Sequence, residues 1–288
     1  MPYTVAVSFD KFRENIELSG DHRETATARK DRVVSLLKNS FEILDAFSTG
    51  SIPRFTAVRG HADLDVMVAL HYGKHIKGKN PSGVLQEVRD ALGEYRTNVR
   101  KNGQAVTLSY KTWPDVDIVP VARTVNDAGN VTHYEVPDSN SETWIVSKPH
   151  THSKVMSQKN EECGPDFKRI VKMIKWWNHR HSSLLQSFHI EVMALKIFAG
   201  ELDDYSWNIF RYFEETAELA GSSLWQDDAE ADGYLSFDDR QEVIKRLKTA
   251  RDKAREAWYL TYGQNDNHEK AIEIWRQIFG SEFPVYGS

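Results

Sequence analysis

The residues best suited to chemistry in this sequence are two aspartates separated by a single residue. Asp63 and Asp65 open a segment that runs to Leu70, alternates in polarity and is rich in valine and methionine, as a sheet strand is. Side chains two apart in a strand face the same way, so both carboxylates would project from one face. Two carboxylates this close repel each other, and a divalent cation relieves that repulsion. A solvated acidic face is the alternative for an isolated pair.

A third acid is expected from a neighbouring strand. Asp117 lies inside a short apolar run, where a buried carboxylate is costly unless it is paired or bound to a metal ion. Asp115 lies nearer the preceding turn and remains a substitute. Magnesium prefers oxygen ligands and is commonly held by a few carboxylates together with substrate phosphates. We therefore expect two Mg²⁺ ions, or Mn²⁺ in their place, at Asp63, Asp65 and Asp117.

A turn upstream of these acids offers a place for a phosphate group. Gly50 permits a backbone conformation barred to other residues, and exposed N–H groups with the Ser51 hydroxyl would hold a phosphate beside the metal ions. Three carboxylates, two metal ions and this turn predict a site for phosphoryl transfer. One ion would lower the pKa of an attacking ribose hydroxyl, and the other would neutralise triphosphate oxygens and the departing pyrophosphate. Asp117 should lie nearest the attacking hydroxyl.

The first half of the chain mixes helices and strands that would position this site. After a short lead, helical spacing of apolar residues from 25 to 44 predicts one long packing helix that ends near Ser48. Apolar runs with β-branched residues at 105–110 and 116–121 predict strands. Between them and the aspartates, residues 81–95 have the spacing of a helix.

The second half is predicted to be helical, because strand signals disappear beyond Pro149. Helical periodicity recurs in four segments, at residues 166–177, 184–198, 239–259 and 269–279. The acidic, small-residue stretch 226–232 is expected to be an exposed loop. We therefore expect an α+β fold, with a catalytic core and N-terminal packing helix at residues 1–150 and a helical lobe that completes the nucleotide cleft at residues 151–288.

Composition narrows the classes of function. The chain has 288 residues, 40% hydrophobic and 27% charged, as folded proteins do. A net charge of -5 excludes the broad positive field of a duplex-binding protein. The single cysteine, Cys163, excludes an internal disulfide and a thiolate zinc cluster. No stretch approaches the ~20 apolar residues that span a bilayer, so a cytoplasmic protein with no membrane attachment is expected.

These residues resemble a known superfamily, the nucleotidyltransferases of the DNA polymerase β type. Within it, the sequence is most similar to the bacterial cGAS/DncV-like nucleotidyltransferases (CD-NTases), relatives of the animal oligoadenylate synthases and cGAS. The likeness covers residues 25–198. It rests on Gly50-Ser51, the following Thr56, the pair Asp63-x-Asp65, and the distant Asp117-Ile118-Val119-Pro120.

The helical half carries further parts of the resemblance. Residues 167–178 and the helix after them resemble the paired helices that follow the catalytic sheet in this family. The resemblance directs Lys175 at the triphosphate, and Lys172, one turn away, would share that side; solvated lysines on an amphipathic helix are the alternative. Ser187 would approach the same phosphates or simply occupy a helix contact. Asn160, just before the first helix, lies where similar enzymes contact a base, or is an ordinary helix-entry asparagine.

The resemblance implies synthesis of a cyclic di- or trinucleotide second messenger from ribonucleoside triphosphates, with release of pyrophosphate, in bacterial antiphage (CBASS) signalling. An enzyme that makes linear oligonucleotides or extends RNA ends is one alternative. A non-catalytic nucleotide-binding module is another, and the intact set of three acids argues against it. The acidic charge, and the lack of cysteines for a DNA-holding zinc module, argue against a nucleic-acid template. We expect a monomer that interacts with regulatory or effector proteins of the same defence system.

Overall fold

The computed structural model describes residues 3–18, 20–93, 95, 97–99 and 103–288, which form two compact units. The sheet unit consists of Leu18–Phe55 and Gly60–Ser153. The helical unit consists of Met1–Glu17, Thr56–Arg59 and Lys154–Ser288. The expected division at residue 150 therefore differs in detail, because the N-terminal segment and the four residues before Gly60 group with the helical unit.

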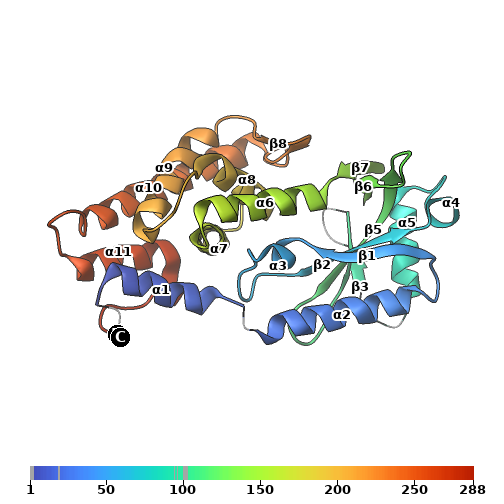
Figure 1. The fold of residues 1–288 in the computed structure, drawn as a ribbon, viewed down its shortest axis with the longest axis horizontal. Coiled ribbons are helices and arrows are strands. Elements are labelled where there is room, and N and C mark those ends of the chain that lie inside the picture. The colour runs from blue at the N-terminus through green and yellow to red at the C-terminus, as the bar shows by residue number, and fades with distance from the viewer. Residues whose placement is uncertain (1–2, 19, 94, 96, 100–102) are drawn as a thin grey trace. The chain divides into compact units, whose positions relative to one another are not determined.

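The sheet unit is built on one mixed sheet (Figure 1). Among the described residues the strand order is β1-β2-β5-β4-β3, with β6 paired to β5 and β7 to β6. Strands β2 and β5 are parallel, and the other pairs are antiparallel. The elements are α2 Asp21–Leu37, β1 Ile43–Thr49, α3 Ser51–Arg54, β2 Leu64–Leu70, α4 Tyr72–His75, α5 Pro81–Ala91, β3 Thr97–Val99, β4 Val106–Leu108, β5 Val116–Val125, β6 Val131–Asp138 and β7 Thr143–Ser147.

Burial along β2 explains why this strand forms. Leu64, Val66 and Val68 are fully buried, and helices α2 and α5 lie against the sheet. On the alternate side, Met67 and Ala69 join an apolar cluster with residues of β5 and β6. A strand that is apolar on both sides, except where its aspartates stand, therefore lies at the centre of the sheet. The aspartates at its start are held by a buried scaffold.

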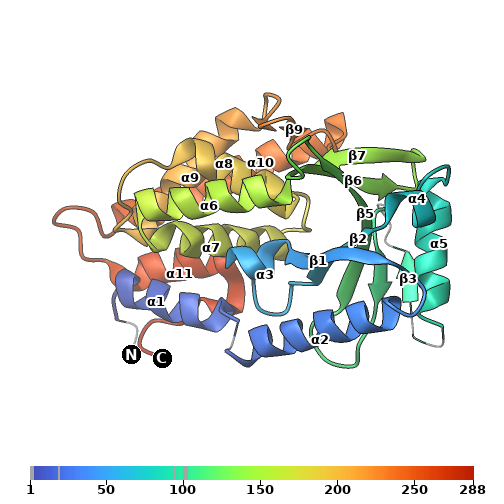
Figure 2. The same cartoon turned by 45° about the vertical axis from the view of Figure 1, so that its right-hand side comes forward.

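The helices of the helical unit pack around a hydrophobic core of their own. Figure 2 shows how these helices are arranged within the unit. Its elements are α1 Val5–Ile16, most of α6 Pro149–Cys163, α7 Asp166–Arg180, α8 Ser187–Ile197, α9 Tyr205–Leu219, β8 Trp225–Gln226, β9 Ala229–Glu230, α10 Phe237–Tyr259, α11 His268–Phe279 and the 3₁₀ turn Gly280–Glu282. Helix α1 belongs here because its aromatic side chains pack into this core. The Phe9 ring centroid lies 5.0 Å from that of Trp275 and 5.0 Å from that of Phe283.

The structure corrects two expectations about local structure. The helix predicted over residues 25–44 forms as α2, but its predicted end is wrong, because α2 ends at Leu37 and residues 43–49 form β1. Pairing with β2 overrides the helical spacing of the last apolar residues. The lead before it forms α1. The loop predicted at 226–232 contains the β8–β9 hairpin, and Asp232 within it is buried and paired with Arg240 at 2.7 Å.

The expected α+β class, with a mixed sheet and a helical part, is confirmed. The segments predicted as strands overlap β2, β4 and β5, and the five shorter segments predicted as helices overlap α5, α7, α8, α10 and α11. In the described part of the chain, no helix has the length and apolar character needed to cross a membrane.

Candidate active site

The sheet places two of the predicted acids in one polar row across four adjacent strands. Thr49 in β1 is the register partner of Asp65 in β2, and Asp65 is the partner of Asp117 in β5. Asp117 is in turn the partner of Thr107 in β4. Register partners point to the same face of a sheet, so the two carboxylates are neighbours. The Thr107 hydroxyl donates a hydrogen bond of 2.5 Å to Asp117 Oδ1 and fixes that carboxylate.

Asp63 stands one residue before β2 and two residues before Asp65, the member of this row in β2. The first register pair of the β2–β5 ladder is Leu64 with Val116, so Asp63 lies just beyond the ladder. Exposure alternates here: Asp63 is exposed, Leu64 is buried and Asp65 is partly exposed. Extended backbone with this alternation directs the two aspartates to the same side, as the sequence predicts.

Gly50 approaches the row closely. Its φ is +77°, and a Cβ built on it would lie 1.9 Å from Asp65 Oδ2. A side chain at this position would therefore collide with the carboxylate, and L residues rarely adopt this backbone conformation. Ser51, the first residue of α3, follows directly. The structure thus brings the predicted phosphate-binding turn and the aspartates together within the sheet unit.

Asp115 has a different environment from Asp117. Its Oδ1 accepts a hydrogen bond of 2.8 Å from the backbone N–H of Tyr110, and it precedes β5. Asp117 is fully buried inside the strand. Asp115 thus closes its own loop, and this geometry favours Asp117 as the third acid.

A hollow of about 430 Å³ adjoins Asp63 in the same unit. Its lining includes His61, Lys111 and Trp113. Burial lowers the pKa of His61, so its ring is neutral at pH 7 and adds no positive charge beside Asp63. Lys111, in the loop between β4 and β5, supplies the positive charge of this lining.

The donors present fit a metal ion that is shared with a substrate. The described residues contain no group of three or more acidic, histidine or cysteine side chains that could hold a metal ion by itself. Mg²⁺ does not require such a cage, because it keeps several waters and is bound by one or two carboxylates plus phosphates. Adjacent Asp65 and Asp117, with Gly50 leaving the approach to Asp65 free of a side chain, match that mode of binding.

The two predicted lysines lie on α7 in the helical unit, and both are buried. Lys175, 2% exposed, donates from Nζ to Glu191 Oε1 at 2.7 Å and to Thr56 Oγ1 at 3.0 Å. Thr56 Oγ1 donates to the same glutamate oxygen at 2.6 Å. Lys172 forms an ion pair with Glu17. The sequence did not identify Thr56 and Glu17 as partners, because they lie far from α7 in the chain, whereas Glu191 lies on the next helix, α8.

Ser187 and Asn160 lie on two other helices of the helical unit. Ser187 is exposed at the first position of α8, and the preceding Gln186 N–H donates to the Tyr234 hydroxyl at 2.8 Å. Tyr234 also contacts His189 Nδ1 at 3.0 Å, and burial lowers the pKa of His189 to about 4. Asn160 precedes α7, as expected, but it lies inside α6 and is therefore not a helix-entry asparagine.

The ion pair of Lys175 gives the first testable prediction. Lys175→Met should lower the free energy of unfolding by about 3 kcal/mol, because it leaves Glu191 buried without its cation. Lys175→Met combined with Glu191→Leu should recover most of that loss, and Lys245→Met, at an exposed lysine of α10, is the control. Denaturant unfolding measures all four proteins. A Lys175→Met protein with unchanged stability and a raised KM for triphosphate would contradict the structural role.

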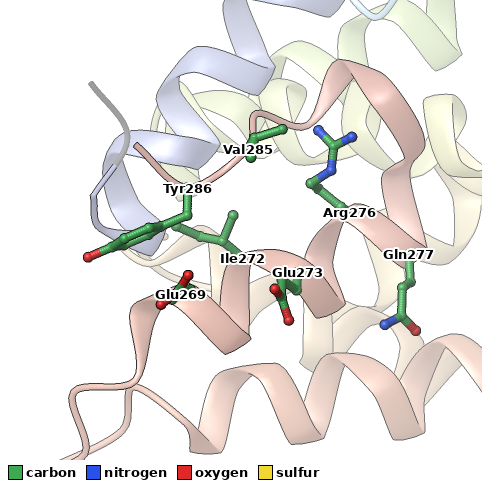
Figure 3. Close-up of a pocket in the computed structure, with 7 residues that line it drawn as sticks. All are labelled: Glu269, Ile272, Glu273, Arg276, Gln277, Val285 and Tyr286. Carbon is green, nitrogen blue, oxygen red and sulfur yellow. The ribbon is translucent and has the colours of Figure 1, made fainter. Parts of the chain in front are cut away.

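Another hollow, of about 480 Å³, lies on α11 and the C-terminal segment (Figure 3). Glu269 and Glu273 contribute carboxylates to its lining, which a triphosphate would disfavour. The guanidinium of Arg276 donates to the Phe283 carbonyl at 2.7 Å. This hollow is therefore a poorer candidate for a triphosphate site than the row of Asp65 and Asp117.

Residues 3–160 match a family model described as the Second Messenger Oligonucleotide or Dinucleotide Synthetase domain (SMODS). The chain belongs to this family. The matched residues include Gly50, Ser51 and the three predicted aspartates. This match confirms the resemblance to bacterial CD-NTases. It also confirms the expectation that the protein is a nucleotidyltransferase that makes an oligonucleotide second messenger. SMODS enzymes of the CD-NTase kind are metal-dependent.

Curated relatives and solved structures agree with SMODS membership. The chain is 26% identical to a cyclic AMP-AMP-AMP synthase of an Acinetobacter species, over 83% of this chain and 72% of the relative. It is 23% identical to the CBASS oligonucleotide cyclase CdnC of Escherichia coli, over 94% of each. The structure of E. coli MS115-1 CdnC with ATP has a TM-score of 0.75 at 17% identity and covers 96% of this chain and 98% of that one. CdnC from that strain also has a solved complex with HORMA-deltaN.

Proposed function

We propose that this enzyme joins ribonucleoside triphosphates into a cyclic di- or trinucleotide and acts in CBASS antiphage signalling. In each step a ribose hydroxyl loses its proton and attacks the α-phosphorus of a triphosphate, and the bond to the departing pyrophosphate breaks. The observation that carries the proposal is the register of Asp65 with Asp117, with Gly50 set against Asp65. The relatives named as cyclic nucleotide synthases favour a cyclic product over a linear one.

Asp63, Asp65 and Asp117 would hold two Mg²⁺ ions, with Mn²⁺ as a substitute. When bound, the ions would neutralise phosphate charge and make the attacking hydroxyl more acidic. Among the chain's own residues, Asp117 lies nearest the attacking hydroxyl in this proposal, and Thr107 orients it through the 2.5 Å hydrogen bond. Fixed orientation matters because catalysis by positioned groups is lost when the reacting atoms are misaligned.

The remaining predicted residues would bind the nucleotide. The Gly50-Ser51 turn would donate backbone N–H groups and a hydroxyl to phosphate oxygens. Ser187 and Lys175 would contact triphosphate oxygens, with Lys172 one turn from Lys175 on α7. For Lys175 this role requires its ammonium to be shared with Glu191 and Thr56, which use two of its three donors. Asn160 would read the edge of a base through its side-chain amide.

The proposed partners are nucleoside triphosphates and a regulatory protein. E. coli MS115-1 CdnC has one structure with ATP and one in complex with HORMA-deltaN, which supports both classes. The net charge of -5 favours an enzyme that works without a nucleic-acid template. A monomeric catalyst is consistent with a site whose three acids all come from one chain.

Product analysis tests the proposal. The purified protein is incubated with radiolabelled triphosphates and Mg²⁺, and the products are then treated with phosphatase. A cyclic product has no terminal phosphate and should keep its label after treatment. A linear product would release its terminal label, and a binding module would form no product at all; either result contradicts the proposed function.

A further inference from the structure

The loop between β4 and β5 is fastened to the residue that precedes Asp63. The indole Nε1 of Trp113 donates a hydrogen bond of 2.6 Å to the Ala62 carbonyl. On the other side of Asp63, the Leu64 N–H donates to the Asp115 carbonyl at 2.9 Å. Asp63 is therefore bracketed by two hydrogen bonds that join the beginnings of the parallel strands β2 and β5.

A single arginine of α2 holds the same loop from outside. Arg29 Nη1 donates to the Thr112 carbonyl at 2.7 Å and also to the Pro114 carbonyl. Its Nη2 donates to Thr112 Oγ1 at 2.7 Å, and its guanidinium carbon lies 4.1 Å from the centroid of the Tyr110 ring. The planar guanidinium satisfies this set of acceptors in a way that a lysine ammonium cannot.

Helix α2 supports Trp113 as well. The His22 ring lies edge-on to the indole, with the centroids 4.4 Å apart. The loop is also closed on itself, because Asp115 Oδ1 accepts from the Tyr110 N–H. Loop residues 110–115 thus connect α2 with the segment that carries Asp63.

Asp63 lies directly before the β2–β5 ladder, between the two residues that this loop contacts. The β2–β5 register begins at Leu64 with Val116, and parallel pairing is slightly less stable per residue than antiparallel pairing. The hydrogen bonds at Ala62 and Leu64 therefore act on the backbone directly before and after Asp63. A metal ligand must be held within about 0.5 Å of its productive position.

We propose that Trp113 and Arg29 are positioning residues that set the place of the Asp63 carboxylate relative to Asp65 and Asp117, and so determine metal affinity. The inference rests on the proposed function, since it assumes that these aspartates bind the metal ions. It assigns to the β4–β5 loop a role in tuning the site although neither residue need touch the metal or the nucleotide.

Mn²⁺ binding to the nucleotide-free protein tests this inference, with free Mn²⁺ measured by electron paramagnetic resonance. Trp113→Phe keeps an aromatic ring but loses the N–H donor, and Arg29→Lys keeps the charge but loses the planar fork. Each should weaken Mn²⁺ binding about tenfold, which is the size of effect seen when groups that orient metal ligands are removed. Because both act through one loop, the double variant should lose less than the product of the two.

Trp144→Phe in β7 is the control, and its Mn²⁺ affinity should equal that of the parent. Thermal melting is recorded for every protein. Unchanged Mn²⁺ affinity in folded Trp113→Phe and Arg29→Lys would overturn the positioning role while leaving the proposed function intact. A parent protein that binds no Mn²⁺, alone or with a non-hydrolysable triphosphate, would overturn the metal assignment itself and the inference with it.

Discussion

Replacing Asp63 and Asp65 together by asparagine is expected to reduce product synthesis at least about a thousandfold, which corresponds to ~4 kcal/mol of lost transition-state stabilisation. The change removes the charge of two proposed metal ligands while keeping the side-chain size. Asp65 is only partly buried and Asp63 is exposed, so the fold should survive. Pyrophosphate release measures the rate, and thermal melting measures the integrity of the fold.

The matched control replaces two aspartates of the same unit that lie outside the row. Asp90 accepts a hydrogen bond from Gln86 on α5, and Asp127 is exposed in the β5–β6 turn. Asp90→Asn with Asp127→Asn changes the net charge by the same amount and should leave synthesis within about twofold of the parent, as exposed substitutions normally do. Near-parental synthesis by the Asp63/Asp65 variant would show that these two aspartates are not needed for the reaction.

The second large effect is expected from Gly50→Ala. The new Cβ would meet Asp65 Oδ2 at 1.9 Å, so the carboxylate must move out of the row. We expect synthesis to fall about a hundredfold or more, as it does when a ligand-orienting contact is lost. Mn²⁺ binding should weaken in parallel, which separates a displaced ligand from a disturbed phosphate contact.

Gly129→Ala separates this collision from backbone strain. Gly129 has a φ of +79°, close to the +77° of Gly50, but a Cβ there would meet nothing within 4 Å. Both variants should lose roughly 1–3 kcal/mol of stability from the strained backbone. Only Gly50→Ala should lose activity. Equal activity in the two variants would show that the approach of Gly50 to Asp65 has no catalytic consequence.

The acidic strands were predictable from sequence because their signals are local. Asp63, Asp65 and Asp117 stand beside or inside short apolar runs, and strand alternation fixes where their side chains point. Helices with strong apolar periodicity, such as α7 and α11, were found for the same reason. Helices α6 and α9 were missed; the sequence of α6 is polar, and its burial depends on packing against other helices.

Other features depend on contacts between distant segments. The helix predicted through Leu44 fails because β1 exists only by pairing with β2. The contact of the Thr107 hydroxyl with Asp117 becomes visible through the register of β4 with β5. Likewise, nothing in the local sequence of Trp113 or Arg29 indicates that both hold the approach to Asp63. A polar residue in the apolar strand β4 was the one local signal that pointed to Thr107.

The balance between pyrophosphate released and nucleotides joined tests the central claim most directly. Closing a ring releases one pyrophosphate for every nucleotide incorporated, whereas a linear chain retains one triphosphate at its end. Both quantities are measured on the same reaction, by enzymatic pyrophosphate assay and by mass spectrometry of the product. The account predicts equal amounts in the parent protein and neither product in the Asp63→Asn, Asp65→Asn variant. A consistent deficit of pyrophosphate, or equal synthesis by that variant, would contradict it.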